Sequence, residues 1–127
     1  MKKDIKFLGV ILLVALIAML PMFTSSYKSS HDTKFHLANI DSLTEQIKDN
    51  FFFPSKIVGE IGNDFGYGTE IFYPPLGHYS AAYINVVVDN PVTSLKIVHF
   101  IGLLLSGITM YYLSKTVSKN KFIGLLS

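Results

Sequence analysis

The residues His31 to His36, with the sequence HDTKFH, bring two imidazoles and one carboxylate together within six positions. If this stretch is helical, Asp32 and His36 lie four residues apart on one helix face. Together they could bind a divalent metal with His31 nearby, or Asp32 could act as a general base that His36 orients. The structural alternative is that Asp32 caps the start of a helix and interacts favourably with the positive end of the helix dipole. The imidazoles would then have no chemical role.

A second group of candidate residues surrounds a Gly-rich turn. Asp64 and Glu70 flank the sequence Gly66-Tyr67-Gly68, and paired carboxylates can bind a cation or sugar hydroxyls. Carboxylates in an exposed loop are also commonly just solvated. The Gly-Tyr-Gly sequence lacks the rest of a channel filter motif, so we interpret it as a turn. Tyr73 fits an aromatic belt at a membrane surface.

Two further histidines fall at the ends of apolar segments. His78 follows the Pro74-Pro75 pair by three residues, and His99 lies near the start of the last long apolar segment. An ionisable group inside a membrane span is costly and tends to be functional. Near the end of a span, however, a neutral imidazole is tolerated, so neither residue is assigned to the site.

The composition indicates a membrane protein. Half of the 127 residues are apolar, the mean hydropathy is +0.40, and the apolar residues fall into blocks. The chain has no Cys, which excludes a thiol nucleophile or a disulfide framework. All eleven basic residues are Lys, and no basic stripe with interleaved aromatics is present. Nucleic acid is therefore not an expected partner.

The first apolar block, residues 7–23, predicts a membrane-spanning helix. A cleaved signal peptide is the alternative. The Lys residues before this block predict a cytoplasmic N-terminus. Residues 24–74 then form a large extracytoplasmic loop, and an amphipathic helix is expected over residues 33–50, because Ile40, Leu43 and Ile47 recur at helical spacing.

Residues 75–90 and 95–114 predict two more spans, with a turn at Asn90-Pro91. In the latter span, Gly102 and Gly107 are expected to let another helix approach closely. The sequence thus predicts an all-α membrane protein with about three transmembrane helices. If 75–90 does not cross, the Lys residues after 114 face the cytoplasm instead of the outside. The apolar run that begins at 122 suggests the N-terminal region of a larger multi-pass protein.

Three motifs together resemble a known family. HDTKFHLANIDSLTEQI, the following FFP and then GYGTEIFYPPL are similar to the start of bacterial integral membrane proteins labelled as 6-pyruvoyl-tetrahydropterin synthase-related. That family in turn resembles the GT-C group of membrane glycosyltransferases. The resemblance covers residues 1–127. Ser30 and Asn39 depart from the pattern, which has Gly and Arg at these positions, and the loss of the Arg weakens any grip on phosphate here.

The resemblance implies a glycosyltransferase in the bacterial cell membrane. A sugar would move from a polyprenyl-phosphate carrier to an extracytoplasmic acceptor, with Asp32 as the catalytic carboxylate and His36 orienting it. A divalent metal, with Asp32 and His36 as candidate ligands, is a possible cofactor, and membrane lipids are expected partners. The alternative is a non-catalytic membrane protein that binds or translocates a lipid or cell-envelope polymer. The full predicted site contains Asp32 and His36 as catalytic residues, and His31, Tyr67, Glu70 and Tyr73 as substrate-binding residues.

Overall fold

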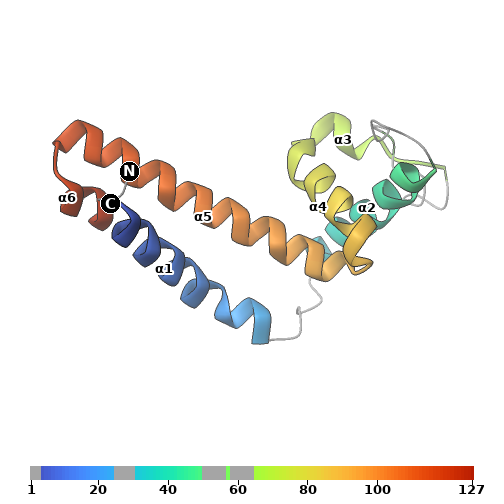
Figure 1. The fold of residues 1–127 in the computed structure, drawn as a ribbon. Coiled ribbons are helices and arrows are strands. Elements are labelled where there is room, and N and C mark those ends of the chain that lie inside the picture. The colour runs from blue at the N-terminus through green and yellow to red at the C-terminus, as the bar shows by residue number, and fades with distance from the viewer. Residues whose placement is uncertain (1–3, 25–30, 50–56, 58–64) are drawn as a thin grey trace. The chain divides into compact units, whose positions relative to one another are not determined.

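The computed structural model describes residues 4–24, 31–49, 57 and 65–127. All the secondary-structure elements within these residues are helices. The all-α prediction is confirmed for this part of the chain. Figure 1 shows the six helices in chain order. They are α1 (Ile5–Thr24), α2 (His31–Lys48), α3 (Thr69–Phe72), α4 (Pro75–Val88), α5 (Pro91–Ser118) and α6 (Lys121–Leu126).

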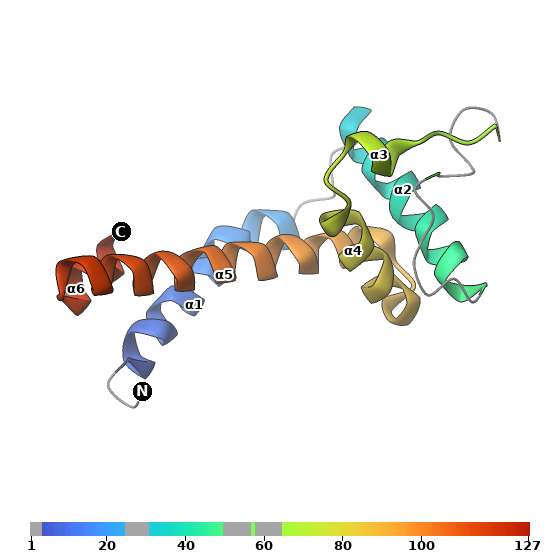
Figure 2. The same ribbon diagram turned by 90° about the horizontal axis from the view of Figure 1, so that it is seen from above.

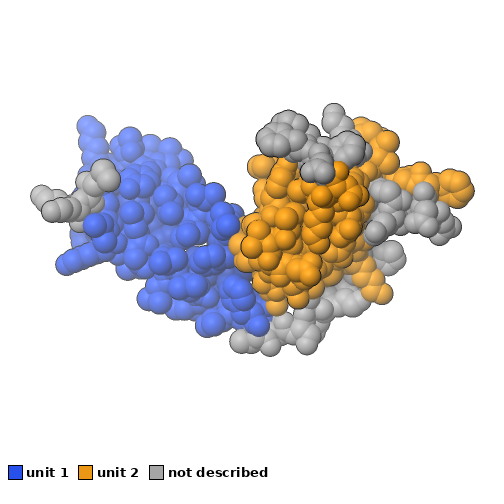
Figure 3. All heavy atoms as spheres, turned by 45° about the vertical axis from the view of Figure 1, so that its right-hand side comes forward, with its two compact units in different colours: residues 1–25, 99–127 blue, residues 26–98 orange. Residues whose placement is uncertain are grey.

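The chain divides into two compact units, coloured separately in Figure 3. Unit 1 comprises residues 1–25 and 99–127, and unit 2 comprises residues 26–98. The long helix α5 contributes its first turns to unit 2 and the remainder to unit 1. Each unit has its own set of contacts and is described by itself.

In unit 1, α1 and α5 run antiparallel. Phe7 stacks on Tyr111 with ring centroids 5.9 Å apart, and one turn later Ile11 lies against Gly107. A Cβ atom built on Gly107 would come within 2.9 Å of the Ile11 Cγ2 atom, so this glycine permits the close approach that its sequence context predicted. A Cβ atom on Gly102 would meet nothing within 4 Å, so Gly102 has no such role among these contacts.

The carboxylate of Asp4 joins the start of α1 to the last turns of α5 and to the first residue of α6. Its Oδ1 atom lies 3.0 Å from Lys115 Nζ and 3.1 Å from Lys121 Nζ, and it accepts a 2.9 Å hydrogen bond from the Tyr111 hydroxyl. These donors, Lys115 foremost, hold the pKa of Asp4 well below its usual range. Figure 2 shows α6 folded back beside the end of α5.

Two of the described helical segments are long and apolar enough to cross a membrane, namely Ile5–Phe23 and Pro91–Ser118. Only 11% of each apolar window is buried, so neither resembles the core helix of a soluble protein. The third predicted crossing, residues 75–90, is not among them. Its helix α4 has 14 residues, which rise only about 21 Å, less than a hydrocarbon layer of about 30 Å.

Unit 2 is built on the packing of α2 against α4. Ile40 of α2, Ala81 of α4 and Leu95 of α5 form its buried apolar centre. The predicted amphipathic helix is therefore confirmed, and it begins and ends two residues earlier than expected. Its outward residues are charged and exposed, namely Asp41, Glu45 and Lys48.

A polar chain extends the core of unit 2. The Asn85 amide donates to the Thr44 hydroxyl at 3.1 Å, and Ser94 Oγ donates to Asn85 Oδ1 at 3.2 Å. All three side chains are buried. These hydrogen bonds therefore connect α2, α4 and the start of α5 through buried polar side chains.

Turn chemistry separates the short helices of unit 2. Gly66 has φ 80°, a left-handed conformation that suits glycine. Pro75 occupies the first turn of α4, where its missing N–H and fixed φ are tolerated. Asp89 ends α4 with φ 50°, and the Asn90 side chain then accepts the Thr93 backbone N–H at 2.9 Å, which caps α5. The predicted turn at Asn90-Pro91 is confirmed.

Candidate functional site

A buried chain of hydrogen bonds links one carboxylate to two imidazoles in unit 2. Glu70 Oε1 lies 2.7 Å from His78 Nδ1, and His78 Nε2 lies 2.9 Å from His36 Nδ1. We call these three residues the relay. It joins the neighbouring helices α3 and α4 to α2, whose His36 lies 42 residues before His78 in the chain. It has the carboxylate–imidazole arrangement that orients catalytic histidines.

Local sequence explains how each member is positioned. The Gly-rich turn before α3 lets Glu70 point inward beside the buried Thr69. The Pro74-Pro75 pair stops one helix and starts the next, which places His78 on the first turn of α4. His36 lies on the face of α2 that packs on α4, one turn before Ile40.

The relay runs from the interior towards the surface. The Glu70 side chain is 0% exposed and the His78 side chain is 8% exposed, whereas His36 is half-buried. A carboxylate at such a position needs a charged or hydrogen-bonding partner, and His78 supplies it. Burial and the neighbouring Glu70 charge both raise the pKa of Tyr79 on α4, burial more strongly, which favours the neutral phenol.

Three buried polar atoms near these elements find no hydrogen-bond partner among the described residues. They are Glu70 Oε2, Thr69 Oγ1 and Asn39 Oδ1. Native interiors rarely leave such groups unmatched, and functional sites are one place where they do. Glu70 therefore uses one oxygen to hold His78 and keeps the other without a protein partner in this part of the chain.

The hydrogen bonds of the relay have one direction when Glu70 is ionised and both imidazoles are neutral. The carboxylate accepts from His78 Nδ1–H, so His78 Nε2 carries a lone pair. That lone pair accepts from His36 Nδ1–H, which makes Nε2 the basic nitrogen of His36. A proton taken up there yields a positive charge that can be shared with His78 and stabilised by Glu70. The arrangement can therefore act as a general base and then as a general acid.

The structure brings some of the sequence-predicted residues together. His36 and Glu70 are both in the relay. Tyr73, which ends α3, packs its ring 5.5 Å from that of Phe35, next to His36. Tyr67 is 52% exposed and contributes no contact to the relay.

Other predicted residues stand apart from the relay. Residues 31–36 are helical, so Asp32 does lie four residues before His36 on α2, and it is exposed. His31 begins α2, but its side chain lies outside the described residues, as does Asp64. Neither can be assigned a contact.

A metal site is not assembled in the described part of the chain. No group of three or more potential His, Asp or Glu ligands occurs there. Asp32 and His36 would supply two ligands, fewer than the three that protein metal centres commonly use. The possible divalent metal therefore stays a prediction.

His78 is the functional candidate that sequence reasoning missed. Its position at the start of an apolar helix suggested a tolerated neutral imidazole. The available signal was the rule that ionisable groups in apolar segments tend to be functional. Its partners lie 8 and 42 residues away in the chain, and no local pattern reveals them.

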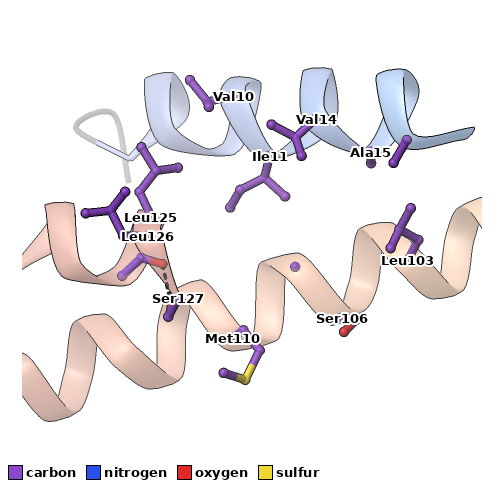
Figure 4. A pocket seen from close by; sticks show the side chains of 13 residues that line it. Val10, Ile11, Val14, Ala15, Leu103, Ser106, Met110, Leu125, Leu126 and Ser127 are labelled. Atoms are coloured by element: carbon purple, nitrogen blue, oxygen red, sulfur yellow. Dashed lines mark hydrogen bonds between the residues drawn. The ribbon is translucent and has the colours of Figure 1, made fainter.

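Unit 1 contains an apolar cavity of about 500 Å³ between α1, α5 and α6. Figure 4 shows its lining, which includes Val10, Val14, Leu103, Met110 and Leu125. Its polar side chains are Ser106 and Ser127, and no titratable residue is among those that line it. The cavity has space for an apolar group but no means of acid–base chemistry, so the relay remains the candidate site.

Comparison with known proteins yields one informative similarity. No family model matches the chain, and no solved structure matches it. The chain is 26% identical over 130 residues to an uncharacterized protein of Lactococcus lactis subsp. cremoris strain MG1363. The similarity covers 99% of this chain and 21% of that protein, so the chain spans about a fifth of its relative's length.

Proposed function

We propose that this chain is part of a polytopic membrane glycosyltransferase whose acid–base group is the Glu70–His78–His36 relay. A sugar would move from a polyprenyl-phosphate carrier to an acceptor on the outer side of the membrane. The observation that carries the proposal is the buried carboxylate hydrogen-bonded through His78 to the half-buried His36. The sugar, the carrier and the acceptor class come from the family resemblance of the sequence.

In this proposal the chain crosses the bilayer twice, through α1 and α5. Antiparallel spans place the start of α1 and the end of α5 on the same side, and the Asp4 contacts with Lys115 and Lys121 support this pairing. The Lys-rich ends then both face the cytoplasm, in accord with the positive-inside rule. The packing of α1 on α5 also favours a retained helix over a cleaved signal peptide. Unit 2 lies outside.

The proposed transfer uses the relay to move one proton. The acceptor hydroxyl oxygen attacks the anomeric carbon of the sugar, while the bond from that carbon to the phosphate oxygen breaks. The phosphate keeps the bonding electron pair, and the hydroxyl proton passes to His36 Nε2. Glu70, through His78, stabilises the positive charge that develops on the imidazoles.

Asp32 is the rival proton acceptor, as the family resemblance implies. It lies one helical turn before His36 and is exposed, so it could meet a substrate from the same side of α2. We favour His36 because its other nitrogen is already engaged in the relay, which fixes its orientation. Asp32 would then position the acceptor or bind a hydroxyl of the sugar.

The test is sugar transfer in membranes from cells that produce the intact protein of which this chain is part. Labelled polyprenyl-phosphate sugars serve as donors, and incorporation into envelope material is measured. His36→Gln and Glu70→Gln should each lower the transfer rate, with a loss of about 10²–10⁴-fold for His36→Gln, the range for removing a general base. Protein levels in the membrane should stay unchanged.

The matched control is His99→Gln, the same substitution at an exposed histidine of α5 outside the relay. It should leave transfer near the wild-type rate. Persistent transfer in His36→Gln with loss in Asp32→Asn would move the base to Asp32. Transfer unaffected by all of these changes would favour the non-catalytic alternative, a protein that binds or translocates a lipid or envelope polymer.

A further inference from the structure

The exposed residues of unit 2 differ in character between α2 and the segment that contains α3 and α4. The outward face of α2 carries charged residues, among them Asp41, Glu45 and Lys48. Between residues 65 and 88 the only charged residue is Glu70, and its side chain is fully buried. The side formed by α3 and α4 therefore offers no exposed formal charge at neutral pH within this stretch.

Helix α3 has an inverted polarity. Its polar residues Thr69 and Glu70 are 0% and 4% exposed, while Ile71 and Phe72 are 60% and 79% exposed. A helix on a water-facing surface normally shows the opposite pattern, with apolar residues inward. The inversion is followed by further exposed apolar side chains at Tyr73, Leu76 and Val87.

We propose that this apolar side, defined by Ile71, Phe72, Tyr73, Leu76 and Val87, inserts into the outer surface of the lipid bilayer. Exposed apolar side chains concentrated in one stretch mark an interaction surface. Residues 65–88 carry no exposed formal charge, which favours an apolar partner over a charged one, and aromatic residues suit the headgroup region. The partner is therefore the apolar boundary of a membrane.

Covalent connections keep unit 2 within reach of that membrane. Six residues separate the end of α1 at Thr24 from the start of α2 at His31, a span of at most about 25 Å. At its other end, α4 is followed after two residues by the apolar helix α5. This inference rests on the membrane part of the proposed function and not on its sugar transfer.

The absence of Trp from the chain permits a direct test. Single variants Phe72→Trp and Leu76→Trp place a reporter on the apolar side at positions that are already exposed. Glu45→Trp is the control on the charged face of α2, and Leu13→Trp, at a 57% exposed position of α1, reports insertion of that helix. Each chain is reconstituted into phosphatidylcholine vesicles with and without brominated acyl chains.

We expect the Phe72→Trp and Leu76→Trp variants to show blue-shifted emission and loss of fluorescence in brominated vesicles, approaching the loss of Leu13→Trp. Glu45→Trp should keep its emission. If both reporters on the apolar side behave like Glu45→Trp while Leu13→Trp is quenched, the surface does not contact lipid and the inference is overturned. If Leu13→Trp is also unquenched, membrane insertion itself fails, and the proposed function fails with it.

Discussion

At the scale of single residues, several buried polar groups lie at or next to one carboxylate of the relay, Glu70. Glu70 is held by His78 through one oxygen, and its second oxygen and the Thr69 hydroxyl have no partner among the described residues. A folded domain retains unmatched buried groups at a cost of about 1–3 kcal/mol each. We interpret this cost as a sign that the site is built for a ligand rather than for stability.

Replacing Thr69 by Val should therefore be neutral or stabilising, by up to about 1 kcal/mol, because a buried hydroxyl that has no partner among the described residues becomes a methyl group of the same shape. The free energy of unfolding is measured by urea denaturation in mild detergent, followed by circular dichroism. The matched control is Thr44→Val. The Thr44 hydroxyl donates to Ile40 O at 2.6 Å and accepts from Asn85.

Thr44→Val leaves the buried Asn85 amide without its acceptor, so a loss of about 1–3 kcal/mol is expected. A loss of the same size in Thr69→Val would mean that the Thr69 hydroxyl has a partner, and the interpretation of the buried polar atoms around Glu70 as a ligand site would be abandoned.

The sequence predicted two of the three relay members. His36 was predicted as the partner of Asp32 on one helix face, and Glu70 as one of two carboxylates that flank a Gly-rich turn. His78 was not selected, since its neighbours in sequence are apolar and its role depends on partners in α2 and α3. The pairing of α2 with α4 decides which imidazole meets which carboxylate, and no spacing rule encodes that pairing.

At the scale of helices, the hydrophobic pattern predicted where helices occur better than where they end. The segment predicted as 95–114 is a helix from Pro91 to Ser118, which continues through Lys96 and Lys115. Charge marks where an apolar run stops, whereas the helix ends only where Lys119 adopts φ 55°. The four residues of α3 are too few for any periodic pattern.

The contact of α1 with α5 can be tested through two glycines of the same helix. In a helix interior, Gly→Ala favours folding by about 0.8–1 kcal/mol when nothing opposes it. Gly102→Ala should show this gain because its Cβ would meet nothing within 4 Å. Gly107→Ala should lose the gain or become destabilising, since its Cβ would lie 2.9 Å from Ile11 Cγ2.

Thermal unfolding of both variants in detergent micelles, followed by circular dichroism, compares the two sites. The melting temperature of Gly107→Ala should fall below that of Gly102→Ala. Equal melting temperatures would indicate that α1 and α5 do not pack at Gly107.

At the scale of the whole molecule, the side of the membrane on which each part of the chain lies depends on how often the chain crosses the bilayer. The sequence favoured three crossings because residues 75–90 are apolar. In the structure these residues form the short helix α4, which buries His78 and Asn85 against other parts of unit 2. The apolar residues of α4 therefore serve two purposes: some pack on α2, and others form an exposed apolar surface. Composition alone cannot distinguish such a helix from a membrane span.

The antiparallel pairing in unit 1 bears on the same question. With three crossings, α1 and α5 would pass through the bilayer in the same direction. The contacts of Asp4 with Lys115 and of Ile11 with Gly107 require opposite directions. Two crossings are compatible with these contacts, and in the proposed topology they place unit 2, with its relay, on the outer side.

The most direct measurement is cysteine accessibility in intact cells, which the chain's lack of Cys makes unambiguous. Ser30→Cys, Thr93→Cys and Ser118→Cys are labelled one at a time with a membrane-impermeant maleimide. We predict labelling at positions 30 and 93 and protection at position 118 until the cells are opened. Labelling at 30 and 118 with protection at 93 would establish three crossings and contradict the proposed pair of antiparallel spans, α1 and α5. Protection at 30 and 93 would place the relay in the cytoplasm and contradict the proposed outer-face transfer.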